Sequence, residues 1–396
     1  MCMEWGVLVS LFAYVVSWML IRGKRSASGV LLLGVFSFAV AYGQARRALA
    51  DDGVERASGK AVSEYVRRAE SSLAQTNLSD DHQHLVGAML LGDRERLTKE
   101  QKTLFRMSGS QHLLALSGVH LGILFSLINL LVLRRVRFTR WRWPVLFATL
   151  FFLWSYALVV GMPKSLMRAG LMLTLFQVGH FSYRDSSGHE ILSSTIFLML
   201  LIDPLSAFDI GAQLSVAALT GMTCFAPLLA NFFSRYDVDG SRIPPRWPWA
   251  VSLWKAFAFS FSAWLFTMPL TMFYFGQFQV WQPLVGVFLV PAVSLMLYPA
   301  VVLIALSIAG VWMLALPLST FLDGFMSVVE LILKACASLP ASSVTLPHTT
   351  LWHVGLLYFL FAILGVAMRY PSRRIALLSA LLVILTLAFF AFLKTV

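Results

Sequence analysis

The chain has 396 residues, of which 58% are hydrophobic and only 13% are charged. This composition excludes a water-soluble protein and predicts an all-α, polytopic membrane protein of about twelve spans or half-spans. The net charge of +12 suits nucleic acid or acidic lipid headgroups, but a cationic excess also fixes membrane topology, so charge alone assigns no function.

Two apolar segments open the chain, at residues 5–21 and 29–43. At ~1.5 Å per residue the first crosses most of a ~30 Å hydrocarbon layer. The alternative is a signal peptide, which is disfavoured because the basic run at 22–25 follows the apolar segment instead of preceding it. We expect this basic loop in the cytoplasm and the amino terminus outside.

Residues 44–111 form a polar region whose charges nearly balance, so it is allowed outside the cytoplasm. From Lys60 to Leu73, apolar and charged residues alternate with a helical period. His82 and His84 approach the spacing of metal ligands, but further ligands are lacking, and we interpret both as solvated.

The stretch 111–124 carries unusual polarity for an apolar helix. On one continuous helix His112 and His120 fall on the same stripe, with Ser117 one turn before His120. Histidines within a membrane helix usually face a protein interior or a wet cavity, so both are predicted site residues. Gly118 and Gly122, four residues apart, predict a close approach of another backbone.

An arginine-rich run with two tryptophans follows at residues 134–143. Such a strip is able to bind nucleic acid, since arginines hold phosphates and aromatic rings stack on bases. We favour the alternative, a cytoplasmic membrane anchor, because arginine and tryptophan are typical of helix ends at the interface.

After a span predicted at 145–162, Pro163 suits the first turn of the next helix. Lys164 and Arg168 then share a helix face, with Ser165 beside Lys164. Two cations near a helix amino terminus predict a phosphate site. Snorkelling explains Lys164 equally well, but Arg168 less well because it lies deeper in the apolar run.

Asp203 and Pro204 end a short apolar segment and suit the cap and first turn of the succeeding helix. In the next span Gly211 and Ser215 form a small-residue packing face. Gln213 needs an internal partner there, and a structural hydrogen bond explains it as well as pore lining does.

Prolines mark the region after a connecting loop at 234–249. Pro269 lies deep in a span at 251–275, where we expect a kink. Pro283, Pro291 and Pro299 recur every eight residues, which predicts a broken or re-entrant segment in place of one helix.

An amphipathic helix comes next, and it either lies in the membrane interface or lines a cavity. Its polar face consists of Ser319, Thr320, Asp323, Ser327, Glu330 and Lys334. Two last spans, at 351–368 and 375–392, flank a basic turn that we place in the cytoplasm, which leaves the carboxyl terminus outside.

Chemical motifs of hydrolases are not found. The histidines are dispersed, the three cysteines are too scattered for a metal cluster, and Gly59-Lys60 lacks the upstream glycine of a phosphate-binding loop. We therefore expect no catalytic residue, metal or cofactor and no ATP hydrolysis.

Several motifs carry a resemblance to a known family: Leu90-Leu91-Gly92-Asp93-Arg94, Gly109-x-x-His112 through His120, Ser165-Leu166-Met167-Arg168-Ala169, Asp203-Pro204 with Gly211 to Ser215, and Thr267-Met268-Pro269 with the proline run to Pro299. As a set and in this order, they resemble the ComEC competence-protein family. The resemblance implies a multi-pass channel in the bacterial cytoplasmic (inner) membrane that admits single-stranded DNA. Members commonly carry a soluble β-barrel in the polar region, where this chain has a helical pattern, and a metallo-β-lactamase-like domain after the channel, so a separate nuclease and motor are expected as partners.

We thus predict three regions: a membrane hairpin at 1–43, an extracytoplasmic helical segment at 44–111 and a channel domain at 112–396. Two alternatives stay open, a transporter or flippase for another anionic substrate and an intramembrane hydrolase with Ser117 as nucleophile and His120 as base. The predicted channel or substrate-binding residues are His112, Ser117, Gly118, His120, Gly122, Lys164, Ser165, Arg168, Gln213 and Ser215.

Overall fold

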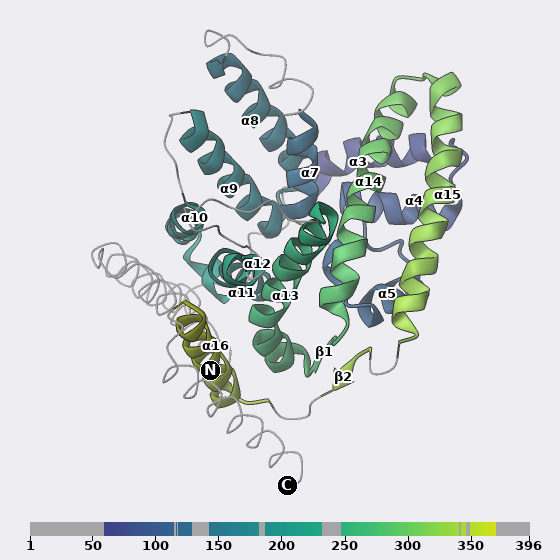
Figure 1. The fold of residues 1–396 in the computed structure, drawn as a ribbon. Coiled ribbons are helices and arrows are strands. Elements are labelled where there is room, and N and C mark those ends of the chain that lie inside the picture. The colour runs from purple at the N-terminus through teal and green to yellow at the C-terminus, as the bar shows by residue number, and fades with distance from the viewer. Residues whose placement is uncertain are drawn as a thin grey trace, which may run out of the picture. The chain divides into compact units, whose positions relative to one another are not determined.

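The computed structural model describes residues 59–114, 116, 118–128, 142–181, 187–231, 247–339, 342–345 and 349–369, and these residues form an all-α fold (Figure 1). They belong to two compact units. Unit 1 holds residues 200–278 and 345–369 of the described chain, and unit 2 holds 59–199 and 279–344. Two short β-segments, β1 (Gln277–Phe278) and β2 (Val344–Thr345), lie where the chain passes between units.

Four described helices are long and apolar enough to cross a membrane: Ile210–Ala230, Pro248–Phe275, Gln282–Ile308 and Trp312–Ala337. Together with the shorter apolar helices Pro144–Val159, Gly188–Ile202 and Leu351–Gly365, they indicate a membrane protein. The spans expected at 5–21, 29–43 and 375–392 lie outside the described residues, so the total of about twelve stays a prediction, as does the division at residues 43 and 111.

Unit 2 is built from short helices of the polar region and longer apolar ones. Its elements are α3 (Gly59–Leu73), α4 (Asp80–Val86), η1 (Gly87–Leu91), α5 (Lys99–Met107), α6 (Gln111–Leu114), α7 (Gly118–Ile128), α8 (Arg142–Val159), α9 (Lys164–Phe181), most of α10 (Gly188–Ile202), α14 (Gln282–Ile308) and α15 (Trp312–Ala337). The helical period from Lys60 to Leu73 is thus confirmed by α3.

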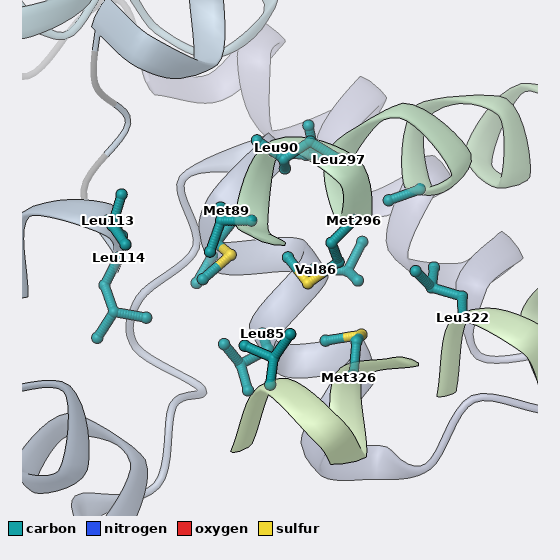
Figure 2. Close-up of a cluster of buried hydrophobic side chains, with 14 of the residues drawn as sticks. Leu85, Val86, Met89, Leu90, Leu113, Leu114, Met296, Leu297, Leu322 and Met326 are labelled. Carbon is teal, nitrogen blue, oxygen red and sulfur yellow. The ribbon is translucent and has the colours of Figure 1, made fainter. Parts of the chain in front are cut away.

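The core of unit 2 joins the polar region to the membrane-length helices. Val86 and Met89, which are 0% and 1% exposed, pack in one cluster with Met296 of α14 and Met326 of α15 (Figure 2). Helices α14 and α15 run side by side, and α3 and α5 also contact this pair. Apolar contacts therefore fix the polar region onto α14 and α15.

The prediction of a broken proline segment is wrong, because α14 is one continuous helix over Gln282–Ile308. Pro283 lies in its first turn, where the missing N–H has no helical partner in any case. Pro291 and Pro299 lie inside the helix and each removes one backbone hydrogen bond. Buried residues at helical spacing, from Val285 to Leu303, hold the helix together across both prolines.

Unit 1 consists of η4 (Pro204–Phe208), α11 (Ile210–Thr220), η5 (Gly221–Phe225), α12 (Ala226–Ala230), α13 (Pro248–Phe275) and α16 (Leu351–Arg369). The predicted cap is confirmed, since the Asp203 carboxylate accepts a hydrogen bond from the Leu205 N–H at 3.1 Å and Pro204 opens η4. Asp209 caps α11 in the same way through the Ala212 N–H at 2.8 Å. Pro269 lies inside α13, and the kink expected there stays a prediction.

Candidate functional site

The central motif is not the single helix that the sequence predicts. Helix α6 ends at Leu114, Leu116 is not helical, and α7 begins at Gly118. The stripe of His112, Leu116 and His120 on one helix is therefore wrong. The physical reason lies in the neighbours of Leu116, whose carbonyl accepts a hydrogen bond from the Ser165 hydroxyl of α9 instead of serving a continuous helix.

Gly118 lies at the contact between α7 and α9. A Cβ atom built on Gly118 would lie 3.1 Å from the Cβ of Ala169, which is closer than ordinary van der Waals contact. The close approach predicted for Gly118 is thus confirmed. For Gly122 it stays a prediction, because no described atom lies within 4 Å of the corresponding position.

A third motif reaches the same place from η1. Gly92 ends η1 with a φ of +84°, a conformation that favours glycine. A Cβ on Gly92 would lie 2.6 Å from Cδ1 of Leu116, so a larger residue there would also require the end of that side chain to shift. The Tyr156 hydroxyl of α8 donates to the Leu90 carbonyl at 2.8 Å, which fixes the last turn of η1.

Charged residues hold the loop after Gly92. Arg96 pairs with Asp93 at 3.0 Å and with Glu70 of α3 at 2.8 Å. Burial raises the pKa of the Glu70 carboxyl above its ordinary value, against the opposing charge of Arg96.

The three motifs at 90–94, 112–120 and 165–169 converge around Leu116, since Ser165 and Gly92 both contact that residue. We call this place the motif junction.

The histidines of the motif junction differ in exposure. His120 is 0% exposed, whereas His112 is exposed. Ser117 lies outside the described residues, so its role stays a prediction.

Two cations occupy the first turns of α9. Lys164 is its first residue and is exposed, whereas Arg168 is only 6% exposed, so snorkelling does not account for Arg168. Removing a guanidinium from water is costly and requires polar or anionic partners. The phosphate site predicted from these two cations and the first turn of α9 stays a prediction.

Gln213 and Ser215 belong to α11 of unit 1 and are described there on their own. Gln213 is 4% exposed, its amide donates to the Ala207 carbonyl at 3.1 Å, and its oxygen accepts from the Tyr274 hydroxyl. These bonds are the internal partners that a buried amide needs. Substrate contact by Gln213 and Ser215 stays a prediction.

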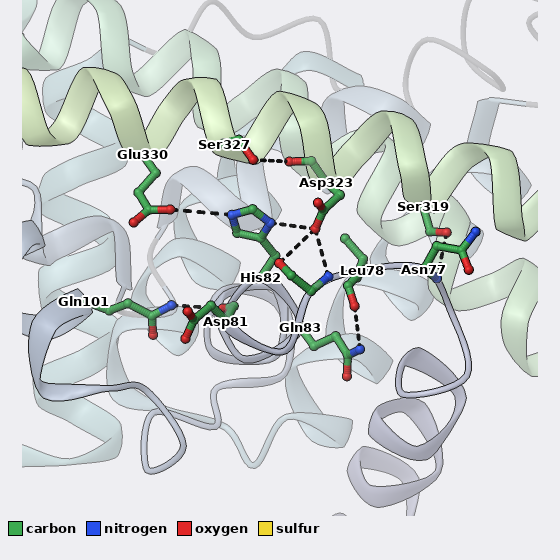
Figure 3. Close-up of polar contacts among 11 residues, drawn as sticks. Asn77, Leu78, Asp81, His82, Gln83, Gln101, Ser319, Asp323, Ser327 and Glu330 are labelled. Carbon is green, nitrogen blue, oxygen red and sulfur yellow. Dashed lines mark hydrogen bonds and ion pairs between the residues drawn. The ribbon is translucent and has the colours of Figure 1, made fainter.

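Sequence reasoning missed a polar cluster formed by residues 77–82 and the polar face of α15 (Figure 3). The Asn77 backbone N–H donates to the Ser319 hydroxyl at 3.1 Å, and the Ser79 backbone N–H donates to the Asp323 carboxylate at 2.8 Å. The face expected at a membrane interface or a cavity is thus partly covered by the chain itself, at Ser319 and Asp323, whereas Thr320, Ser327 and Lys334 are exposed. We call this contact the clasp.

His82 lies at the centre of the clasp and is 5% exposed, so its interpretation as a solvated residue is wrong. Its Nδ1 lies 2.7 Å from Asp323 Oδ1, and its Nε2 lies 3.7 Å from Glu330 Oε2 (Figure 3). Glu330 pairs with Lys334 at 3.0 Å, as the i,i+4 spacing predicts. The nearest sequence signal was the spacing of polar residues along α15, which marks the face but does not name its partner.

The described residues do not assemble a metal centre. Among them, no group of three histidine, cysteine, aspartate or glutamate side chains is placed to hold a metal ion.

Comparison with known proteins identifies the family. The family model described as competence protein matches residues 89–371. The chain is similar to ComE operon protein 3 of Bacillus subtilis (strain 168), at 26% identity over 305 residues that cover 75% of this chain and 35% of the relative. It is also similar to Recombination protein 2 of Haemophilus influenzae, at 27% identity over 256 residues that cover 63% of this chain and 32% of the relative.

The chain thus spans about a third of the length of these two relatives. No solved structure matches it. Because the matched region holds all three segments of the motif junction and most of the described helices, the chain belongs to the competence protein family.

Proposed function

We propose that this chain forms a membrane path through which single-stranded DNA enters the cell across the cytoplasmic membrane. The observation that carries the proposal is the convergence of three motifs at the motif junction, within the region matched by the competence family. The family model is described as competence protein, and one relative is named for recombination, which agrees with a role in DNA uptake.

Physical requirements of a polyanion support the proposal. Each nucleotide brings a phosphate that must exchange water for other polar or cationic partners inside an apolar medium. Lys164 and Arg168 supply cations at the amino terminus of α9, and His120 adds a polar group on α7, which packs against α9. A path of this kind binds backbone and not sequence, as uptake of arbitrary DNA requires.

The proposal concerns the path alone. We assign hydrolysis of the second strand and the driving force to other domains or proteins, and we assign no catalytic activity to the described residues. A transporter of another anionic substrate would use the same cations, and a transformation assay separates the two functions.

Arg168→Gln tests the proposed contact with phosphate. We expect a reduction of about tenfold or more in transformation frequency, because a hydrogen bond to a charged group contributes roughly 1.5–3 kcal/mol. Arg168→Lys is expected to recover part of the activity, since a point charge replaces the planar fork of donors. The measurement is transformation by labelled DNA in a strain that lacks the native gene, with protein level checked by immunoblot.

Lys102→Gln is the matched control, because Lys102 is an exposed cation on α5 and should transform like the wild type. Arg168→Gln protein that is present at normal level and takes up DNA normally would remove Arg168 from the path. A deletion strain that transforms normally would refute DNA uptake itself and favour the transporter of another anion.

A further inference from the structure

The clasp joins two segments that are distant in the chain but belong to the same unit. The contact between His82 and Asp323 spans 241 positions of sequence, and both residues lie in unit 2. Asp323 Oδ1 also accepts hydrogen bonds from the backbone N–H and the hydroxyl of Ser79, at 2.8 and 2.9 Å. One carboxylate oxygen therefore holds both ends of the turn that begins α4.

The imidazole lies between two carboxylates that are seven residues apart on one face of α15. A neutral ring that donates from Nδ1 to Asp323 turns the lone pair of Nε2 toward Glu330, which is unfavourable. A protonated ring donates from Nδ1 to Asp323 and brings its positive charge to 3.7 Å from a Glu330 oxygen, which is an ion-pair distance and not a hydrogen bond. The geometry therefore suits the imidazolium form of His82 better than the neutral form.

Other charges near His82 do not reverse this preference. Lys334 is paired with Glu330 and has a 63% exposed side chain, so water screens much of its charge. Gln101 of α5 is neutral and donates to the Asp81 carbonyl at 3.0 Å, and the sequence of α14 contains no charged residue. The remaining titratable or charged residues on the elements packed here are Asp80, Asp81 and His84 on α4, the exposed Lys99, Glu100, Lys102 and Arg106 on α5, Tyr298 on α14 and Cys336 on α15.

We propose that His82, Asp323 and Glu330 form a proton-binding site that closes the clasp when His82 is protonated and loosens it when the proton leaves. The proton moves between the ring and water at the exposed edge near Glu330, whose side chain is 34% exposed, and no other bond forms or breaks. This proposal does not depend on which substrate the chain transports.

The site is connected to the motif junction through one helical segment. Helix α4 continues without interruption into η1, which ends at Gly92 against Leu116. The clasp holds the first turn of this segment and the motif junction holds its last. Loosening at His82 thus acts on the same rigid element that fixes Gly92.

Hydrogen exchange at peptides covering residues 77–86 measures closure of the clasp directly. The full chain is studied in detergent micelles or nanodiscs between pH 5 and pH 8, with each rate corrected for the intrinsic effect of pH. We expect protection in the wild type to fall by about tenfold as pH rises, near the lower end for a hydrogen bond to a charged group. In His82→Gln, which keeps one donor for Asp323 but does not titrate, protection should not depend on pH.

His84→Gln is the matched control, since it removes a neighbouring imidazole that takes no part in the contacts of His82 with Asp323 and Glu330, and it should keep the pH dependence of the wild type. Glu330→Gln preserves the bond between His82 and Asp323, so it should fold and show a reduced dependence even where His82→Gln does not fold. Wild-type protection that is constant from pH 5 to pH 8 would overturn the proposal. An unchanged pH dependence in Glu330→Gln or in His82→Gln would do the same.

Discussion

Two glycines of the central motif, four residues apart, serve different purposes. Gly118 lets α7 approach Ala169 of α9, whereas no described atom lies within 4 Å of the position that a Cβ on Gly122 would take. Spacing places both on one helix face, but only the partner helix decides which one is a contact. The identity of a small residue therefore matters at Gly118 and less at Gly122.

Gly118→Leu should lower the free energy of unfolding by about 1–3 kcal/mol, because overpacking forces α7 and α9 apart. Gly122→Leu is the matched control and should leave stability near that of the wild type. Thermal unfolding in detergent, followed by tryptophan fluorescence, measures both. Equal losses in the two variants would contradict a specific contact at Gly118.

At the scale of elements, the helix positions followed from apolar periodicity and cap residues, as at α3 and at the start of η4. Apolar periodicity and cap residues did not predict that α14 is continuous or that the helix breaks at Leu116. Packing against α15 and the polar region keeps α14 continuous through Pro291 and Pro299, whereas the contact with Ser165 accompanies a break at Leu116 within an apolar run. Both outcomes depend on partners distant in sequence, which local propensity does not contain.

The candidate site was predictable as a set of residues but not as an arrangement. Motif matching named Arg168 and His120, yet the meeting of Gly92 with Leu116 requires the fold. The role of His82 was not predictable, because its partner Asp323 is 241 positions away and His82 carries no motif of its own.

Helix packing in unit 1 depends on the π-helical turn η5 (Gly221–Phe225) against α13. A Cβ on Gly221 would lie 2.3 Å from the backbone oxygen of Ser262, so the two backbones nearly touch. Small residues are the usual means by which membrane helices reach this distance. Because the neighbouring atom belongs to the backbone of α13, a side chain at position 221 requires that helix to move.

Gly221→Ala should therefore destabilise the protein, by about 1–3 kcal/mol, despite the better helix propensity of alanine. Gly365→Ala on α16 is the control, because its Cβ would meet Phe225 at an ordinary 3.7 Å. Differential scanning fluorimetry of both variants in the same detergent gives the comparison. If the thermal unfolding midpoint of Gly221→Ala is at or above that of the wild type, the two helices move apart at this contact without loss of stability.

For the whole molecule, the cationic loops at 22–25, 134–142 and 369–374 predict which side each span faces. From these loops we predict that both termini, and residues 44–111, lie outside the cytoplasm. Helices α3 and α5 pack on α14 and α15 through apolar contacts. Residues 59–107 therefore belong to the same compact unit as those helices and do not form a separate domain.

Reporter fusions after Ala57 test the orientation. A periplasmic reporter such as alkaline phosphatase should be active there, and a cytoplasmic fluorescent reporter should not. Fusions after Lys24, in the first basic loop, provide the internal control with the opposite result. A fusion after Ala57 that is active only as a cytoplasmic reporter would contradict the predicted topology.

Residues 77–82 contact the polar face of α15, and large apolar side chains are exposed on the rest of the helix. Among them, Met313, Phe321 and Leu331 have exposed fractions of 90%, 66% and 67%. Acyl chains tolerate such a surface, whereas water would drive it to aggregate. Residues 77–82 thus contact the polar face of α15 at Ser319 and Asp323, and the apolar side of the helix is left to face lipid. A fragment containing residues 59–128 and α14 to α15 should accordingly require detergent to stay dispersed, although its amino-terminal third is polar in sequence.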